Sequence, residues 1–377
     1  MKKTIPLLSI CIATKNREYY CIEVIKDILN TSEDIELCIA DNSSTKKIAD
    51  FIENIKDSRV KYEYDPNEIS SIDNFNKCIE LSTGEFVIMI GDDDTVLPTI
   101  YEQVKWMKQE EVDSLSFKYN IDYYWPNSSI EDFKLGCLEY IPDLELEYKR
   151  IETENRLLRL LQEGIIQYQF YELPRIYHGI IKRTILEEIK SKIGNFFDGL
   201  SPDIFSSVSL ALLVENHYVS SKTFTIAGAC NSSTSVQSLK GEHSGLLNNA
   251  PHFKNRHNYQ WNSIIPAYYS VETIWAESAV NALMKFNRKD LLKNFDLNKF
   301  IIKSIILNRK FIFILSLKES LKVLFSNKKF IFSLPFKVLI SLKEMYSRKL
   351  EIINTKKNKE INFLSIAQAS KRITEIC

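Results

Sequence analysis

Apolar runs alternate with amphipathic stretches over the first 120 residues of this 377-residue chain. Strands are predicted by the apolar runs at 7–13, 35–40, 60–64, 86–91 and 114–119, and helices by the helical spacing at 17–29, 45–55, 72–81 and 98–108. Strands that alternate with helices form a parallel sheet covered on both faces. The sequence therefore predicts an α/β fold with a mostly parallel sheet.

Polar clusters follow three of these predicted strands. They are Thr14–Asn16, residues 41–44, and the triplet Asp92, Asp93 and Asp94. Ligands of open α/β sheets bind beyond the carboxyl ends of the strands, so we expect all three clusters on one rim. Three adjacent carboxylates repel one another, and a divalent cation would relieve that repulsion. Taken alone, the triplet is also compatible with an acidic turn ahead of a helix.

The middle of the chain gives weaker signals. We expect an irregular excursion at 120–150, a helix at 153–162, strands at 175–181 and 218–226, and a Ser/Asn/Gly-rich loop at 228–250. Thr184 to Glu187 fits a capping box, and Ser201-Pro202-Asp203 fits a helix start with Ser as the N-cap. After Trp261 the sequence predicts mostly helix.

The net charge of zero hides an asymmetry. The segment 285–359 holds 19 Lys and Arg against 5 Asp and Glu, so an acidic body carries a basic C-terminal region. Basic amphipathic helices bind anionic membrane surfaces, although these lysines could also form the solvated face of a helical subdomain. No aromatic–basic recognition motif is present, so no nucleic-acid partner is expected.

Cysteine usage and hydropathy suggest a location for the protein. The seven cysteines are scattered, without a C-x-x-C pair, and no signal peptide is recognised, which favours a reduced cytoplasmic setting. No stretch of about 18 apolar residues predicts a spanning helix. We therefore expect a cytoplasmic protein, peripheral at the inner face of the cell membrane.

Four segments together resemble family 2 glycosyltransferases of the GT-A fold. They are residues 8–17 (LSICIATKNR), 39–45 (IADNSST), Asn76 with Gly84-Glu85-Phe86, and Gly91–Asp94 with Pro98. The Gly-Asp-Asp-Asp form and the later Ser-Pro-Asp are similar to O-antigen and capsule sugar transferases of the abequosyltransferase type. The resemblance implies a GT-A domain at 1–260, with a nucleotide-binding half at 1–120 and an acceptor half at 121–260. Residues 261–377 would form the basic, mostly helical region.

The resemblance also implies roles for individual residues. Asp41 would contact the nucleotide base, and the other nucleotide-binding positions would be Thr14, Asn16, Asn76, Asp92 and Asp93. Asp94 would bind Mn²⁺ or Mg²⁺, together with Asp92. Phe75 stands where the family usually has Arg, and many relatives have Asp at the position of Gly91.

Asp203 is the candidate catalytic base, because the family places an acid near a helix start in the second half of the domain. The alternative is a helix-capping acid, whose pKa the helix dipole would lower. Asp198 and then Glu215 are the next candidates for the base.

Five other side chains have two interpretations each. His243 could join a metal site or be solvated, and His178 could face the acceptor or pack in the core. Tyr123, Tyr124 and Trp125 could stack on a sugar ring or cover the sheet.

The predicted function is therefore metal-dependent, inverting transfer of a sugar from a nucleotide-diphosphate donor to a saccharide acceptor. A lipid-linked acceptor in bacterial surface polysaccharide synthesis is expected. A nucleotidyltransferase is an alternative, but residues 14–17 lack the glycine of a phosphate-binding loop. A degenerate, membrane-associated scaffold without catalysis is the other alternative.

Overall fold

The fold is taken from a computed structural model that describes residues 5–30, 34–126, 133–233, 241–256, 258–326 and 334–376. Its centre is an eight-stranded sheet in the order β3-β2-β1-β4-β10-β6-β11-β9. The parallel half consists of β1 (Leu8–Thr14), β2 (Ile35–Asp41), β3 (Val60–Tyr64) and β4 (Phe86–Ile90). These four strands match the predicted ones closely.

The other half of the sheet is mixed. β10 (Gly179–Lys182) runs antiparallel between β4 and β6 (Ser114–Phe117). β11 (His217–Ser220) is parallel to β6, and β9 (Tyr148–Ile151) closes the edge antiparallel to β11. The sheet is therefore mostly, but not wholly, parallel.

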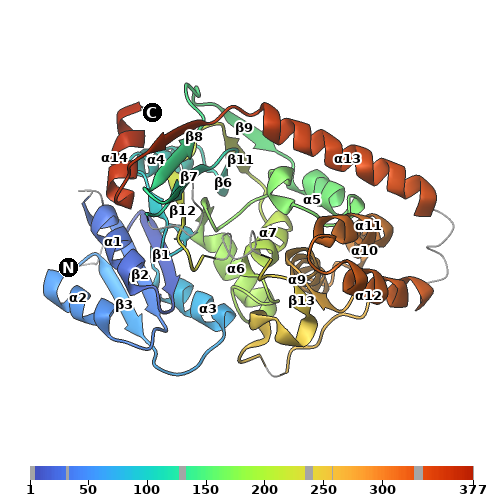
Figure 1. The fold of residues 1–377 in the computed structure, drawn as a ribbon. Helices are drawn as coiled ribbons and strands as arrows, with labels where there is room; N and C mark the ends of the chain where they lie inside the picture. The colour runs from blue at the N-terminus through green and yellow to red at the C-terminus, as the bar shows by residue number, and fades with distance from the viewer. Residues whose placement is uncertain are drawn as a thin grey trace.

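Helices cover both faces of the sheet, because alternate residues of its buried strands point to opposite sides. On one face α1 (Glu18–Leu29), α4 (Ile100–Gln109) and α14 (Ile366–Ile376) pack in a cluster with Leu8, Ile10 and Ile12. On the other face α3 (Ser71–Leu81), α6 (Arg183–Ile193) and α7 (Pro202–Ala211) pack in a cluster with Cys11. Helix α2 (Lys47–Ile55) lies beside α1 (Figure 1).

A second, five-stranded sheet has the order β15-β8-β7-β12-β5. It contains β15 (Asn358–Ile361), β8 (Cys137–Tyr140), β7 (Ile121–Tyr124), β12 (Thr225–Ala229) and β5 (Thr95–Val96). Two predictions are corrected here. Residues 120–150 contain strands β7, β8 and part of β9, and the single strand expected at 218–226 is two strands in two different sheets.

The C-terminal region is mostly helical, as predicted. Its helices are α9 (Val271–Lys285), α10 (Lys289–Leu292), α11 (Leu297–Asn308), α12 (Phe313–Ser326) and α13 (Leu334–Asn354). With α5 (Thr153–Gln162) and α7, helices α9 to α12 surround a second large hydrophobic cluster, and α13 packs on α11. A short hairpin of β13 (Gly245–Leu246) and β14 (Tyr268–Tyr269) precedes α9. The last elements return to the N-terminal half, where β15 pairs with β8 and α14 packs on α1 (Figure 1).

Helix starts give one confirmation and one correction. Ser201 is the N-cap of α7 and Pro202 is its first residue, as predicted, although the Ser201 side chain makes no capping hydrogen bond. The capping box at Thr184 is wrong, because α6 begins at Arg183 with Lys182 as the N-cap. Within the described part of the chain, no helix is both long and apolar enough to span a membrane.

Candidate active site

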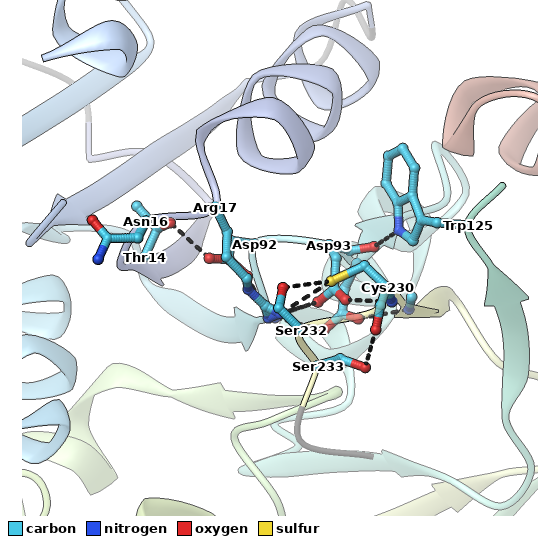
Figure 2. Close-up of polar contacts among 12 residues, drawn as sticks. Thr14, Asn16, Arg17, Asp92, Asp93, Trp125, Cys230, Ser232 and Ser233 are labelled. Carbon is cyan, nitrogen blue, oxygen red and sulfur yellow. Dashed lines mark hydrogen bonds and ion pairs between the residues drawn. The ribbon is translucent and has the colours of Figure 1, made fainter. Parts of the chain in front are cut away.

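The polar clusters after β1, β2 and β4 meet on one rim of the large sheet, as predicted. The hydroxyl of Thr14 donates to Oδ2 of Asp92 at 2.6 Å, which joins the ends of β1 and β4 (Figure 2). Asn16, at φ 57°, joins the loops after β1 and β2: its backbone N–H donates to Ser43 Oγ at 2.9 Å, and its Oδ1 accepts from the N–H of Ser44 at 2.8 Å. These contacts fix the rim before any ligand binds.

A guanidinium group lies against the first two aspartates of the triplet. Nη2 of Arg17 lies 2.7 Å from Oδ1 of Asp92 and 3.2 Å from Oδ1 of Asp93. The backbone N–H of Cys230 donates to the other carboxylate oxygen of Asp93 at 3.1 Å, and the indole N–H of Trp125 donates to the carbonyl oxygen of Asp93 at 3.0 Å (Figure 2). Arg17 and the N–H of Cys230 therefore offset much of the repulsion among the carboxylates, for which the sequence predicts a divalent cation.

Burial and charge oppose each other in this cluster. Burial raises the pKa of Asp92, and the charge of Arg17 and the Thr14 hydroxyl offset only part of the rise. Burial likewise raises the pKa of Asp93, to about 7, against the opposing effect of Arg17. Burial alone would lower the pKa of Arg17, but the two carboxylates raise it above its ordinary range. Arg17 is therefore a permanent cation beside two carboxyl groups that resist ionisation.

Asp94 has the opposite behaviour, because its carboxylate is surrounded by hydrogen-bond donors. Oδ1 accepts the N–H of Gly228 at 2.7 Å, and Oδ2 accepts the N–H of Gly91 at 2.5 Å and the hydroxyl of Tyr177 at 3.1 Å. Nε2 of His178 lies 3.0 Å from the same Oδ2. Burial raises the pKa of Asp94, but His178 and the two backbone donors lower it more, so the net pKa is below the ordinary value. Asp94 is the member of the triplet that stays anionic.

Two glycines make this close packing possible. A Cβ on Gly228 would lie 1.7 Å from the backbone oxygen of Asp93, so no larger residue fits where β12 passes the triplet. A Cβ on Gly91 would lie 2.6 Å from the hydroxyl of Tyr177 and 2.8 Å from Oδ2 of Asp94. The glycine that departs from the family pattern at position 91 therefore leaves room for Tyr177 and Asp94.

The side chains that could ligate a metal here suit a hard divalent cation only if substrate oxygens complete its coordination. Among the described residues, no three His, Cys, Asp or Glu side chains are grouped as a metal site. Asp94 and His178 offer an oxygen and a nitrogen at one place, whereas Asp92 would have to exchange its contact with Arg17 for a metal. Mg²⁺ commonly binds through one or two carboxylates together with substrate phosphates. These residues fit that kind of site.

Asp41, at the end of β2, is almost fully buried at the same rim. Its Oδ2 accepts from the hydroxyl of Tyr62 at 2.8 Å, and its Oδ1 accepts from the N–H of Ser43 at 2.8 Å. Each carboxylate oxygen has room for a second donor. Asp41 is therefore held in a fixed orientation and still has acceptor capacity.

Two asparagines on α3 differ in a way that the sequence does not show. Asn76 uses its whole amide internally, since it donates to the carbonyls of Ile72 and Phe197 and accepts from the N–H groups of Phe196 and Phe197. Asn74 donates to the carbonyls of Thr14 and Ala40, at 3.2 Å each, and its buried Oδ1 has no partner among the described residues. Because both partners of the Asn74 nitrogen are carbonyls, its orientation is fixed and an acceptor is left over at the rim. The nucleotide role of Asn76 stays a prediction, and Asn74 is a residue that sequence reasoning missed.

Asp203 lies in the first turn of α7 and is partly buried. Its carboxylate makes no hydrogen bond or ion pair with any residue that the structure describes. Burial and the charge of Asp94 raise its pKa to about 6, although His178 and Arg175 act in the opposite direction. The helix dipole alone would lower the pKa of Asp203, but burial outweighs that effect.

The other two candidates for the base have different surroundings. Asp198 pairs with Arg256 at 2.6 Å and with Lys285 at 2.9 Å. Burial raises the pKa of Asp198, but these two cations bring it below its ordinary value, which makes it a poor proton acceptor. Asp198 lines a polar cavity of about 680 Å³ together with Tyr259 and Asn281. Glu215 is exposed, and its backbone N–H donates to Oδ2 of Asp113.

The remaining candidates separate into two groups. Tyr123 and Trp125 are buried in the core that covers the sheets, and Tyr124 stacks on Phe133 at a centroid distance of 3.7 Å, so packing is the better interpretation for all three. His243 lies near His252 and Tyr269, and is not among the partners of Asp94. His178, by contrast, lies in the centre of the site: its Nδ1 is 2.9 Å from Oγ1 of Thr225.

Besides Asn74 and Tyr177, sequence reasoning missed further contributors to the site. Arg17 was quoted as part of a motif without a role, and the N–H groups of Gly228 and Cys230 lie more than 130 residues from the triplet that they bond. A cation next to a predicted rim is the one sequence signal that could have identified Arg17.

The sequence model described as "Glycosyl transferase family 2" matches residues 9–159. This span contains the rim and the whole aspartate triplet. Residues 9–159 belong to glycosyl transferase family 2. The predicted resemblance is thereby confirmed, and with the observed sheet and C-terminal helices the predicted fold class is confirmed as well.

Curated relatives match part of this family 2 domain. The chain is 31% identical over 96 residues to abequosyltransferase RfbV of Salmonella typhimurium, which covers 24% of this chain and 29% of the relative. It is also 31% identical over 96 residues to GalNAc(5)-diNAcBac-PP-undecaprenol beta-1,3-glucosyltransferase of Campylobacter jejuni, which covers 24% of this chain and 31% of the relative. The chain therefore spans less than a third of the length of these relatives.

A solved structure with a similar arrangement is S. aureus TarS 1-349 in complex with UDP-GlcNAc. It covers 95% of this chain and 97% of the TarS chain, at a TM-score of 0.46 and 14% identity. At this level the likeness adds nothing to the family assignment.

Proposed function

We propose that this protein is a metal-dependent, inverting glycosyltransferase that uses a nucleotide-diphosphate sugar. The observation that carries the proposal is the meeting of Asp41, Asp92 and Asp94 on one rim of the sheet, within the span that matches the family 2 model. The pKa values of Asp94 and Asp203 agree with it. The pKa of Asp94 is lowered, whereas that of Asp203 is raised to about 6 and responds to the charge of Asp94. Such pairs divide the work in active sites, because one group stays anionic and the other exchanges protons near neutral pH.

The donor nucleotide is proposed to bind along the rim. Asp41 would accept from a base N–H, and Thr14, Asn16, Asn76, Asp92 and Asp93 are the other proposed contacts. The buried, unpartnered Oδ1 of Asn74 supports this placement, because an orphaned acceptor is costly unless a ligand donates to it. Arg17 supplies a fixed positive charge where a diphosphate would lie.

Asp94, with Asp92, is the proposed site for Mn²⁺ or Mg²⁺. When bound, the ion would offset the negative charge that develops on the nucleoside diphosphate leaving group. His178 fixes the orientation of the Asp94 carboxylate, and Arg17 does the same for Asp92.

Asp203 is proposed as the base for the acceptor hydroxyl. The acceptor oxygen forms a bond to the anomeric carbon while the bond from that carbon to the diphosphate oxygen breaks, and the hydroxyl proton passes to the Asp203 carboxylate. A single displacement of this kind inverts the anomeric centre. A base without an internal partner and with a pKa of about 6 suits this role at neutral pH.

The acceptor is proposed to be a saccharide, lipid-linked and part of bacterial surface polysaccharide such as O-antigen or capsule. The name of the Campylobacter relative includes a PP-undecaprenol saccharide, and the other relative is an abequosyltransferase. Residues 1–260 are proposed as the catalytic domain, with nucleotide and acceptor halves, and 261–377 as a basic region that places the enzyme at the inner face of the cell membrane.

The test is release of nucleoside diphosphate from UDP-, GDP-, dTDP- and CDP-sugars by the purified chain, with Mn²⁺ or with EDTA. Each donor is assayed with and without undecaprenyl-diphosphate saccharides. Acceptor-stimulated release with one donor, abolished by EDTA and by Asp94→Asn, supports the proposal. Nucleotide binding without release from any donor would instead indicate the non-catalytic scaffold.

A further inference from the structure

Helix α13 is amphipathic, and its charged face is the one turned toward the protein. Lys337 pairs with Asp296 on the N-terminal side of α11 at 2.7 Å, and Glu344 pairs with Lys299 and Lys303 of α11 at 2.6 Å each. One turn further along, Arg348 pairs with Glu163 at 2.6 Å. The face of α13 that packs on the body is therefore held by ion pairs.

The opposite face of α13 is apolar and exposed. Its residues are Leu339, Leu342, Tyr346, Leu350 and Ile353, with exposed fractions between 39% and 68%. At about 100° per residue, this stripe is centred on the side of the helix opposite to the ion-paired face. α13 lies along the outer edge of the molecule (Figure 1).

Helix α12 also has exposed apolar residues, although its buried side packs by serines and by Val323 and Leu324 rather than by ion pairs. Ser316 and Ser320 are buried toward the body, whereas Ile314, Leu321 and Phe325 are exposed, at 80%, 38% and 68%. In Figure 1 α11 lies between α12 and α13, and both helices pack on it. Exposed apolar residues in such numbers mark a binding surface rather than ordinary exposure.

The charges beside these exposed apolar residues identify the occupant. On α13, Lys343 and Lys349 lie on either side of the apolar stripe, and on α12 Lys318 and Lys322 lie along it; all four are exposed. Lysines that border an apolar stripe are typical of helices that lie in an anionic lipid interface, because their amines reach the headgroups while the stripe enters the acyl region. A second copy of this chain would bring lysines against lysines.

We propose that the outward face of α13 forms a docking surface for an anionic lipid bilayer. Its apolar stripe enters the outer part of the acyl layer, and Lys343 and Lys349 contact lipid phosphates. The ion pairs of Lys337, Glu344 and Arg348 keep α13 in this orientation. The inference deepens the proposed membrane location, but it does not depend on the transfer reaction.

The experiment is co-sedimentation of the full chain with phosphatidylglycerol-rich vesicles and with pure phosphatidylcholine vesicles. The stripe variant is Leu339→Ser with Ile353→Ser, and the matched control is Leu246→Ser, which removes an equally exposed leucine from β13. We expect the stripe variant to bind at least tenfold more weakly and the control to bind like the wild type. The pair Lys343→Gln and Lys349→Gln should weaken binding to anionic vesicles roughly 25-fold, at about fivefold for each lysine.

Equal vesicle binding by the stripe variant and the control would overturn the proposal. The proposal would also be overturned if the wild type did not bind vesicles but formed a dimer, and the stripe substitutions dissociated that dimer. Release of nucleoside diphosphate in vesicle-free buffer is measured on every variant, because the stripe variants should retain it. Loss of vesicle binding with release intact separates a failure of this surface from a failure of the proposed chemistry.

Discussion

Asp203→Asn should reduce transfer and at the same time stabilise the folded protein above pH 6. The carboxylate has no hydrogen-bond or ion-pair partner among the described residues, so the substitution breaks no such contact there. Removing a general base typically costs about 10²–10⁴-fold in rate. The same change removes a charge that the folded state accommodates poorly.

The stability gain follows from the pKa. Folding raises the pKa of Asp203 from 3.8 to about 6, which corresponds to at most about 3 kcal/mol at about 1.4 kcal/mol per unit. Because the side chain is partly exposed, solvent reduces this figure, and we expect a gain of about 1–3 kcal/mol. The folded state keeps its proton while the unfolded chain loses it, so the cost in the wild type develops between pH 3.8 and about 6 and is constant above that. The gain from Asp203→Asn should therefore be complete at pH 8 and absent near pH 3.

The assay is urea unfolding at pH 8 and pH 4, together with release of nucleoside diphosphate at pH 8. Asp198→Asn is the matched control, because the same substitution five residues earlier removes ion pairs with Arg256 and Lys285. Because folding lowers the pKa of Asp198, this carboxylate stabilises the folded protein at pH values above its ordinary pKa, and the stabilisation is lost as the pH falls. Asp198→Asn should therefore be less stable than the wild type at pH 8. Wild-type activity should also fall as the pH drops below about 6. Full activity of Asp203→Asn, or a loss of stability at pH 8, would refute the reasoning.

Three further substitutions test the rest of the site. Arg17→Ala leaves Asp92 and Asp93 buried without a cation, so we expect the free energy of unfolding, measured with urea, to fall by about 3–5 kcal/mol at pH 8. The loss should be smaller at pH 5, because the carboxyl groups then bind protons. An equal loss at both pH values would contradict this. Asn76→Ala should cost about 2–4 kcal/mol through the contacts that it makes with residues 196–197, and it should also weaken nucleotide binding. Unchanged nucleotide affinity in this variant would contradict the proposed contact. Gly228→Ala should displace β12 and abolish release of nucleoside diphosphate. A variant with wild-type activity would show that the close approach of residue 228 to the backbone of Asp93 is not required.

The first half of the fold could be predicted from the sequence, because each strand there is a continuous apolar run that ends in polar residues. The runs ending at Thr14 and Asp41, and the run before Asp92, predicted both the strands and their common rim. The position of β10 between β4 and β6 could not be predicted, because its antiparallel pairing depends on strands about 60 to 95 residues away in the sequence. For the same reason the turn between β11 and β12 was missed, and two strands of different sheets were read as one.

The chemistry of the rim was readable only in part. The family pattern pointed to the aspartates, but the features that set their pKa values come from elsewhere in the chain. Arg17 follows β1, His178 precedes β10, and the N–H of Cys230 follows β12. The basic character of the C-terminal region was visible in the composition. Which face of α13 turns outward was not, since the charged face is as regular in sequence as the apolar one.

The most direct test of the central claim is a thermal-shift panel of UDP, dTDP, GDP and CDP, each with and without Mn²⁺. Wild type, Asp94→Ala and the exposed-site control Glu215→Gln are compared, because a ligand that binds only the folded state raises its melting temperature. The account predicts stabilisation of the wild type and of the control by one nucleotide with Mn²⁺, and none in Asp94→Ala. A shift that is the same in Asp94→Ala, or no shift with any nucleotide, would contradict it.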